Sequence, residues 1–275
     1  MPNQNRLVTF TTDFGTADHY VGTMKGVVLG INPEARIADV CNSVQSFDIL
    51  DGALTIAQAY SYFPSGTVHV VIVDPGVGSS RRPILVNVQK HYFVAPDNGV
   101  LSLIYEREQS VSVRHITAEH YFLQPVSQTF HGRDIFAAVA GHLSKGVDVD
   151  KFGDEITDFV RFAAPRPKPN GAAEMKGIVI KVDKFGNLIT NFRPSDVPQL
   201  FAGVSAPLRM RVGKMDVSGI KSSYAEGAPG EVFAIVGSSD FIEIVTNRGS
   251  AARLCSADKG AEVSLAIPSA AASKR

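Results

Sequence analysis

Carboxylate, guanidinium and imidazole side chains stand in two polar segments that could together activate a water molecule. The segment DPGVGSSRR (74–82) places Asp74 and Arg81 on either side of a glycine turn, close enough to share a small site. The segment TFHGRD (129–134) places His131 just before a predicted helix. A neutral imidazole can serve as a base or as a hydrogen-bond donor near pH 7. From spacing alone, an ion pair that fixes the loop and a structural histidine remain open as alternatives.

Asp13 follows an apolar run in the segment TTDFG (11–15) and is a candidate for binding a sugar. A carboxylate only accepts hydrogen bonds, so it could accept one from each hydroxyl of a ribose. The alternative is a carboxylate that caps a helix or fixes a turn. Two further polar segments are more typical of structure: APDNG (95–99) of a helix cap, and DKFGN (183–187) of a hairpin turn.

The position of these segments directly after predicted strands supports a role in ligand binding. In open α/β sheets, ligands bind outside the carboxyl ends of the strands. Apolar β-branched runs alternate with helical periods in residues 1–165, which predicts an α/β domain with a central mixed sheet. The main elements expected there are strands at 7–12 and 68–73, a helix at 20–31 with Asp18 as its N-cap, and a helix at 135–143 opened by Gly132.

A second domain is predicted after the proline-rich stretch RFAAPRPKPNGAA (161–173). Proline lacks an amide donor and disfavours helix before it, so this stretch is expected to be an extended linker. Residues 173–268 then change to short strands and turns, which favours a small β-barrel domain, and the tail 269–275 is expected to be flexible. The strands expected are 177–182, 188–191, 208–212, 231–236, 241–245 and 262–267.

The composition excludes several other classes of protein. The 275 residues include 27 Lys+Arg and 27 Asp+Glu, so the formal net charge is zero. A neutral chain lacks the electrostatic attraction for phosphate backbones that a nucleic-acid-binding protein needs, so nucleic acid is not expected as a partner. The chain lacks a signal segment and any apolar run near the roughly 18 residues of a membrane span, so a cytoplasmic protein is expected. Cys41 and Cys255 lie far apart in the sequence and are expected to be reduced, buried thiols and not a metal pair.

Six segments, in this order, closely resemble the S-adenosyl-L-methionine hydrolase family, also called SAM hydroxide adenosyltransferases and related to the fluorinase and chlorinase enzymes. The resemblance runs from about residue 7 to about residue 267. Chance agreement of six ordered segments is implausible. The segments are TDFGTADHYVGTMKG (12–26), DPGVGSSRR (74–82), FVAPDNGVLS (93–102), TFHGRD (129–134), VDKFGNLITN (182–191) and SSDFIEIVTNRGSAA (238–252).

The resemblance implies an enzyme in which activated water attacks the 5′-carbon of S-adenosyl-L-methionine, giving adenosine and L-methionine. It implies no cofactor and no metal. Asp74, Arg81 and His131 resemble the set that positions and activates the water, and either Asp74 or His131 could take its proton. Family members typically form trimers with the substrate at subunit interfaces, so a homotrimer with a small-molecule substrate is expected.

The resemblance also implies contacts to the substrate. Asp13 resembles the carboxylate that holds the ribose hydroxyls. Phe185 and Asn187 resemble an adenosine-contacting turn, and Asp183 resembles the residue that receives the methionine amino group. Ser239, Glu243 and the backbone near Arg248, in segment 238–252, resemble the part of the family's site that contacts the edge of the adenine ring.

Three other functions compete with hydrolysis. A halide-dependent adenosyl halide synthase of the chlorinase type would use halide in place of water, but halogenating members lack the intact Asp-Arg-His set. A non-enzymatic sensor of adenosine or S-adenosyl-L-methionine would need Asp13, Asn187 and Ser239 but no water-activating set. A methyltransferase is disfavoured because the first strand is not followed by a glycine-rich nucleotide loop with an acidic partner about 20 residues later.

Overall fold

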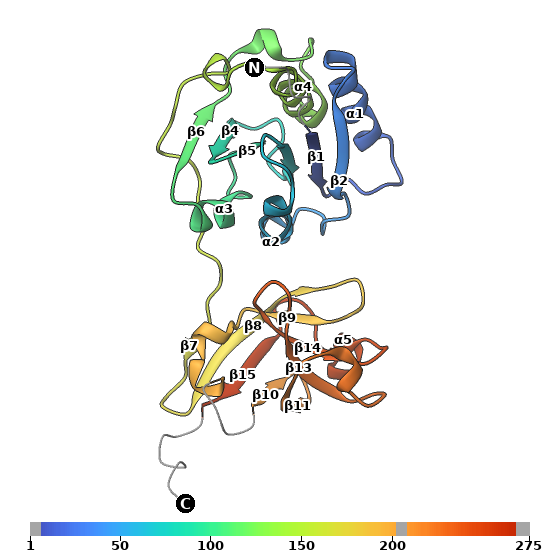
Figure 1. The fold of residues 1–275 in the computed structure, drawn as a ribbon, viewed down its shortest axis with the longest axis vertical. Helices are drawn as coiled ribbons and strands as arrows, with labels where there is room; N and C mark the ends of the chain where they lie inside the picture. Colours follow the sequence, from blue (N-terminus) through green and yellow to red (C-terminus); the bar gives the residue numbers. More distant parts are fainter. Residues whose placement is uncertain (1–6, 202–207, 268–275) are drawn as a thin grey trace, which may run out of the picture. The chain divides into compact units, whose positions relative to one another are not determined.

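The computed structural model describes residues 7–201 and 208–267 of the 275-residue chain. The chain forms two compact units, Met1–Ala164 and Pro165–Arg275 (Figure 1). The first is a mixed α/β unit, and the second is built mainly of β-strands, as the sequence predicts. The tail 269–275 lies outside the described residues. Within the described ranges, no helix combines the length and the apolar character needed to cross a membrane.

The first unit is built on a six-stranded mixed sheet with the order β2-β1-β3-β5-β4-β6. β1 pairs in parallel with β2 and β3, β3 pairs in parallel with β5, and β4 is antiparallel to β5 and β6. All five residues of β3 are buried, as expected for the run VHVVI inside a parallel sheet. The strands are β1 Leu7–Thr12, β2 Arg36–Cys41, β3 Val68–Ile72, β4 Pro83–Val88, β5 His91–Pro96 and β6 Val111–His115.

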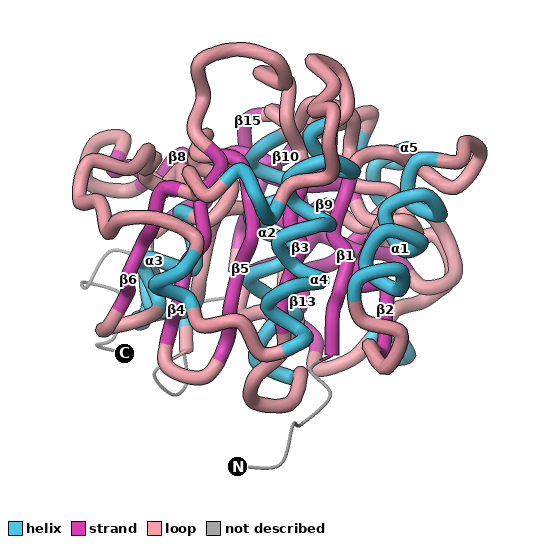
Figure 2. The backbone as a smooth tube through the Cα atoms, turned by 90° about the horizontal axis from the view of Figure 1, so that it is seen from above, coloured by secondary structure: helices cyan, strands magenta, loops and turns pink. Residues whose placement is uncertain are grey.

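Helices cover both faces of this sheet: α1 and α4 lie above it and α2 and α3 below it in Figure 1, and Figure 2 looks onto the face with α1 and α4. α4 lies beside α1, and both contribute to a core that contains Val8 and Phe10 of β1 and Ile72 of β3. Successive strand residues face opposite sides, so Val73 points to the other face. There it contacts α2, where a Cβ on Gly52 would lie 2.8 Å from the Val73 side chain. The helices are α1 Tyr20–Ile31, α2 Ile49–Ala59, α3 Ser102–Arg107 and α4 Ala138–Lys145, with a π-helical turn η3 at Gly132–Ala137.

The predicted strands and helices of this unit are present, but two caps are wrong. α1 spans the expected residues, but its N-cap is His19 and not Asp18: the His19 carbonyl accepts from Thr23 N. The segment 95–99 does not cap α3, whose N-cap is Leu101 with no side-chain hydrogen bond. Asp97 bonds to Arg82 and Val160, and Asn98 bonds to the Val73 carbonyl and to the nearby Val100 amide.

One cysteine also differs from expectation. Cys255 is buried, and burial raises the pKa of its thiol to about 11. Cys41 is only half-buried, because it ends β2 at the edge of the sheet.

The second unit forms a nine-stranded sheet that curls into a nearly closed, barrel-like structure. Its strand order is β11-β10-β15-β8-β9-β14-β13-β12, with β7 paired to β8. Its main core gathers buried apolar side chains from most of these strands and from α5. The elements are β7 Lys168–Pro169, β8 Glu174–Val182, β9 Leu188–Thr190, β10 Arg209–Val212, β11 Met215–Ser218, β12 Ile220–Lys221, β13 Val232–Val236, β14 Ile242–Thr246, α5 Ala251–Cys255 and β15 Glu262–Ala266.

The six strands expected in this unit are all present, and three further strands and α5 were not foreseen. β11 and β12 are short and separated by a single glycine, so they leave little periodic signal. β7 falls inside the stretch 161–173 that was expected to be a linker, where Lys168 and Pro169 pair with β8. Proline is tolerated there because β7 lies off the main strand order and uses only one neighbour.

Candidate functional site

Arg81 binds both Asp74 and His131, so the three residues form one connected cluster. Arg81 Nε lies 3.1 Å from Asp74 Oδ1 and 2.9 Å from Oδ2, and Arg81 Nη2 donates to Asp74 Oδ2. The same Nη2 lies 2.8 Å from His131 Nδ1. The side chains of Arg81 and Asp74 are 8% and 5% exposed, so this ion pair is shielded from bulk water. The structure therefore brings together the three residues predicted to activate water.

The contact with Arg81 fixes the state of the His131 ring. A guanidinium has donors and no acceptor, so His131 Nδ1 must be the acceptor and carries no proton. Neutral His131 then holds its proton on Nε2 and presents a donor there. Burial, followed by the positive charge of Arg81, lowers the pKa of His131, which favours this neutral form.

Arg81 also keeps one donor free of protein partners. Its Nη1 atom is buried and has no hydrogen-bond partner among the described residues, while its guanidinium carbon lies 5.1 Å from the centre of the Phe136 ring. A buried donor without a partner is costly and calls for a specific explanation, such as a bound water or a catalytic role. Nη1 can thus supply a hydrogen bond to a small oxygen ligand.

The loop that carries Asp74 and Arg81 packs against the loop before His131. Gly78 has a φ of +77°, and a Cβ at this position would overlap the Gln128 carbonyl oxygen. The second loop is held in turn by Asp134, whose fully buried carboxylate accepts from Ser127 N at 2.8 Å. Glycine at 78 therefore permits the close approach of the two loops that carry the cluster.

Asp13 lies at the end of β1, the strand beside β3 in the sheet, and is half-buried. Its Oδ2 accepts a hydrogen bond from Phe47 N at 2.8 Å, which holds the exposed Phe47 in a left-handed conformation with φ 64°. The neighbouring Phe14 lies near Gly132, where a Cβ would be 3.3 Å from its ring. Phe14 directly follows Asp13, and Gly132 directly follows His131. Each of these two candidate site residues is thus adjacent in sequence to one of two residues that pack together.

In the second unit, Asp183 organises the turn between β8 and β9. Its Oδ1 accepts from the backbone amides of Phe185 at 2.9 Å and Asn187 at 2.8 Å, and its Oδ2 accepts from Asn187 Nδ2 at 2.8 Å. Gly186 adopts a φ of +86° in this turn. The hairpin turn predicted from DKFGN is confirmed, and the Asn187 amide is oriented by Asp183.

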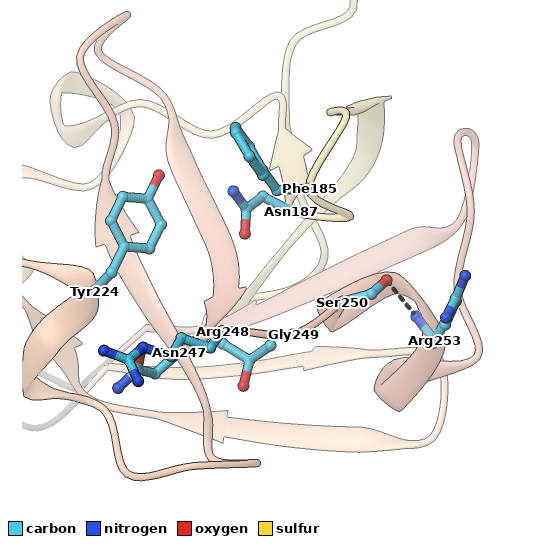
Figure 3. Close-up of a pocket in the computed structure, with 9 residues that line it drawn as sticks. Phe185, Asn187, Tyr224, Asn247, Arg248, Gly249, Ser250 and Arg253 are labelled. Carbon is cyan, nitrogen blue, oxygen red and sulfur yellow. Dashed lines mark hydrogen bonds between the residues drawn. The ribbon is translucent and has the colours of Figure 1, made fainter.

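Phe185 and Asn187 line a cavity of about 660 Å³ together with Arg248 (Figure 3). Tyr224 lies across the cavity from Phe185 and Asn187 in this view. Phe185 is 75% exposed and Tyr224 46% exposed, although both are large aromatic residues. A flat ring bound between them would cover apolar surface that water now reaches.

Three of the residues predicted in the second unit do not line this cavity. Asp183 holds the turn that carries Phe185 and Asn187 but is not part of the cavity wall. Ser239 lies in the turn between β13 and β14, and Glu243 is buried in β14, where it fills the space beside Gly237. Burial, followed by the charge of Asp183, raises the pKa of Glu243. Sequence reasoning missed Tyr224 and Arg253, since each is an ordinary surface residue until the fold places it at the cavity wall.

Within residues 7–201 and 208–267, no group of three or more His, Cys, Asp and Glu side chains could hold a metal ion. The cluster in the first unit instead offers guanidinium and imidazole donors beside a carboxylate acceptor. Such a set can orient an oxygen nucleophile and accept its proton.

Comparison with known proteins connects these residues to a family. A model of the SAM hydroxide adenosyltransferase N-terminal domain matches residues 8–153, and a model of the C-terminal domain of the same family matches residues 177–264. The chain belongs to the SAM hydroxide adenosyltransferase family. The first match contains Asp13 and the Asp74, Arg81 and His131 cluster.

Relatives of this SAM hydroxide adenosyltransferase family member span most of the chain. An (R)-S-adenosyl-L-methionine hydrolase of Salinispora tropica is 34% identical over 260 residues, which cover 92% of this chain and 95% of that protein. The hydrolase of Methanocaldococcus jannaschii is 38% identical over 162 residues, 56% of this chain and 59% of that protein. A solved structure of an uncharacterized conserved protein from Thermotoga maritima has a TM-score of 0.86 and 34% identity, covering 94% of this chain and 99% of that chain.

More distant relatives carry a different name. A fluorinase of Actinoplanes sp. is 25% identical over 205 residues, which cover 66% of this chain and 69% of that protein. Members of this group therefore include proteins named for halide chemistry as well as proteins named for hydrolysis.

Proposed function

We propose that this protein is an enzyme that hydrolyses S-adenosyl-L-methionine to adenosine and L-methionine. Water attacks the ribose 5′-carbon in line with the carbon–sulfur bond, a carbon–oxygen bond forms, and the electron pair of the broken bond stays on sulfur. The sulfonium already carries the positive charge, so the thioether leaves neutral and needs no acid and no cofactor. The observation that carries the proposal is Arg81, which contacts Asp74 and His131 and keeps Nη1 as a buried donor.

The arrangement of donors favours Asp74 over His131 as the acceptor of the proton from water. His131 Nδ1 is occupied by Arg81 and His131 Nε2 carries a hydrogen, so the neutral ring can orient water but has no free lone pair. Asp74 Oδ1 receives one hydrogen bond from Arg81, whereas Oδ2 receives two. The second lone pair of Oδ1 can then take the proton as the oxygen bonds to carbon.

We assign the substrate contacts to both units of the chain. In the first unit, which spans about residues 1–165, Asp13 would accept hydrogen bonds from the ribose hydroxyls. In the second unit, the exposed Phe185 and the oriented Asn187 amide suit a nucleoside, and Asp183 suits an ammonium group. Support for this assignment is the cavity of about 660 Å³ with aromatic and amide walls. Arg248 at the cavity wall is a further proposed contact. Ser239 and Glu243 do not line the cavity and are proposed from the family resemblance alone.

Self-association and location are part of the proposal. A homotrimer is proposed from the family resemblance, and light scattering on the purified protein should give three times the monomer mass of 29.5 kDa. A monomer at working concentration would contradict it. A cytoplasmic location agrees with the free thiols of Cys41 and Cys255, since disulfides are rare in that compartment.

Chromatography of the products formed from S-adenosyl-L-methionine, with and without chloride or fluoride, tests the proposed function. Hydrolysis predicts adenosine and methionine at a rate that halide does not change. Product that appears only with halide would indicate a halide synthase. Tight adenosine binding without turnover would indicate a sensor. Either result would overturn the proposal.

A further inference from the structure

The segment APDNG (95–99) lies at the carboxyl end of β5, next to the loop that carries Asp74 and Arg81. It was expected to cap a helix and does not. Its two polar side chains bond to residues at both ends of that loop. These contacts have no part in substrate binding as proposed above, so they require their own explanation.

Asn98 holds the first end of the loop. Its Nδ2 donates to the carbonyl oxygen of Val73, the residue directly before Asp74, at 2.8 Å. Paired residues of β3 and β5 end at Val70 and Val94, so sheet pairing with β5 does not reach Val73. The Asn98 side chain supplies this missing connection, and its own Oδ1 is fixed by Val100 N at 3.1 Å.

Asp97 holds the other end. Its amide donates to the carbonyl oxygen of Arg82, the residue directly after Arg81, at 2.8 Å. Its buried carboxylate also accepts from Arg82 Nε at 3.0 Å and Nη2 at 2.8 Å through Oδ2. Asp97 Oδ1 accepts from Val160 N at 2.8 Å, so this carboxylate is itself fixed.

We propose that Asp97 and Asn98 are positioning residues that clasp both ends of the 74–82 loop and so set the geometry of Asp74 and Arg81. This inference rests on the proposed hydrolysis. Misplacement of reacting groups by about 1 Å can cost roughly 100-fold in rate. Loss of the clasp should therefore lower kcat and leave substrate affinity unchanged, because neither residue contacts the substrate.

Asn98→Asp is the sharpest test, because it keeps an oxygen for Val100 N, removes the donor to Val73 and sets a charged carboxylate oxygen against that carbonyl. Asn32 offers a matched control. Its Oδ1 accepts from Glu34 N, also two residues on, at 3.2 Å, and its Nδ2 donates to Ser144 Oγ at 2.9 Å. Asn32→Asp thus makes the same change of charge and removes a side-chain donor at the end of α1, outside the loop. The Ser144 hydroxyl, unlike the Val73 carbonyl, can donate to the new carboxylate, so this control reports the effect of the charge.

We expect Asn98→Asp to lower kcat by roughly 10- to 100-fold with KM within about twofold of wild type, and Asn32→Asp to leave both near wild type. Hydrogen exchange of the loop amides of residues 76–82 should become faster in Asn98→Asp only. Equal kcat in the two variants, or a raised KM at unchanged kcat, would overturn the clasp.

Wild-type activity tests the proposed function, and hydrogen exchange of the loop tests the clasp, so failure of one can be told from failure of the other. If wild type fails to hydrolyse S-adenosyl-L-methionine, the proposed function fails and the hydrogen-exchange comparison still judges the clasp. If Asn98→Asp does not fold, Asp97→Asn serves in its place, since it removes the charge that binds Arg82 and retains an oxygen for Val160 N. Unchanged loop exchange in the folded variant would contradict the inference.

Discussion

Arg81 is the side chain on which the proposed chemistry depends, because it links the carboxylate and the imidazole through separate N–H groups. Its charge is permanent, so it can lower the cost of partial hydroxide without giving up a proton. Lysine offers the same charge from a single nitrogen and lacks the planar fork that reaches two partners at fixed angles. The geometry of the guanidinium matters here as much as its charge.

Arg81→Lys is therefore expected to lower kcat by roughly 100-fold or more, comparable to the loss of a donor that stabilises a transition state. Binding of adenosine, measured by calorimetry, should change little, because Arg81 is not among the proposed nucleoside contacts. Recovery of near wild-type kcat with lysine would show that charge alone is sufficient. Loss of adenosine binding in proportion to the loss of kcat would also contradict the assigned role.

At the residue scale, residue types and spacing could not distinguish a catalytic cluster from structural residues. Asp74 and Arg81 could have been a structural ion pair, and His131 stands 50 positions after Arg81 in the sequence. Only the fold shows that Nδ1 of His131 faces Arg81, which fixes the hydrogen on Nε2. The Asn98 contact could not be foreseen either, because its partner is a backbone carbonyl.

At the scale of elements, the parallel strands β1 and β3 are adjacent and bring Asp13 and Asp74 to the same edge of the sheet. This arrangement was predictable, since apolar runs followed by polar residues mark the carboxyl ends of strands. The predicted caps were less accurate. Asp18 and the 95–99 segment have the composition of helix caps, but the N-caps of α1 and α3 are His19 and Leu101, and neither makes a side-chain cap hydrogen bond.

The approach of the two catalytic loops depends on Gly78. A Cβ there would overlap the Gln128 carbonyl oxygen, and φ is +77°. Gly66 provides a control, because it has a φ of +85° and nothing lies within 4 Å of its ideal Cβ. Both substitutions to alanine carry the left-handed backbone cost of about 1–2 kcal/mol. Only the substitution at 78 also displaces a loop.

We expect Gly78→Ala to lower kcat at least tenfold and Gly66→Ala to leave kcat near wild type, with both variants losing thermal stability. Steady-state kinetics and thermal melts of the two proteins provide the measurement. If both variants retain full turnover, contact between the loops does not position the cluster.

At the scale of the whole molecule, the buried His69, which contacts the partly buried His91, links stability to pH. His69 is fully buried, with Nδ1 2.7 Å from Thr9 Oγ1 and Nε2 3.3 Å from His91 Nδ1. Burial, followed by the charge of His91, lowers the pKa of His69 to about 3. The unfolded chain binds this proton near pH 6.5, so between pH 6.5 and about 3 acid favours the unfolded state by about 1.4 kcal/mol per pH unit.

Urea unfolding at pH 7 and pH 5 should therefore show a larger loss of stability in wild type than in His69→Gln, by about 2 kcal/mol. The substitution also changes packing at every pH, so the comparison rests on the change in stability with pH. Parallel losses in the two proteins would mean that His69 takes up no extra proton on unfolding.

In the proposed hydrolysis, water is the nucleophile that attacks the ribose 5′-carbon. Hydrolysis of S-adenosyl-L-methionine in ¹⁸O-labelled water, without halide, tests it most directly by mass spectrometry of both products. Attack by water places one labelled oxygen in adenosine, on the 5′-hydroxyl, and none in methionine. Unlabelled adenosine, label in methionine, or no product until halide is added would contradict it.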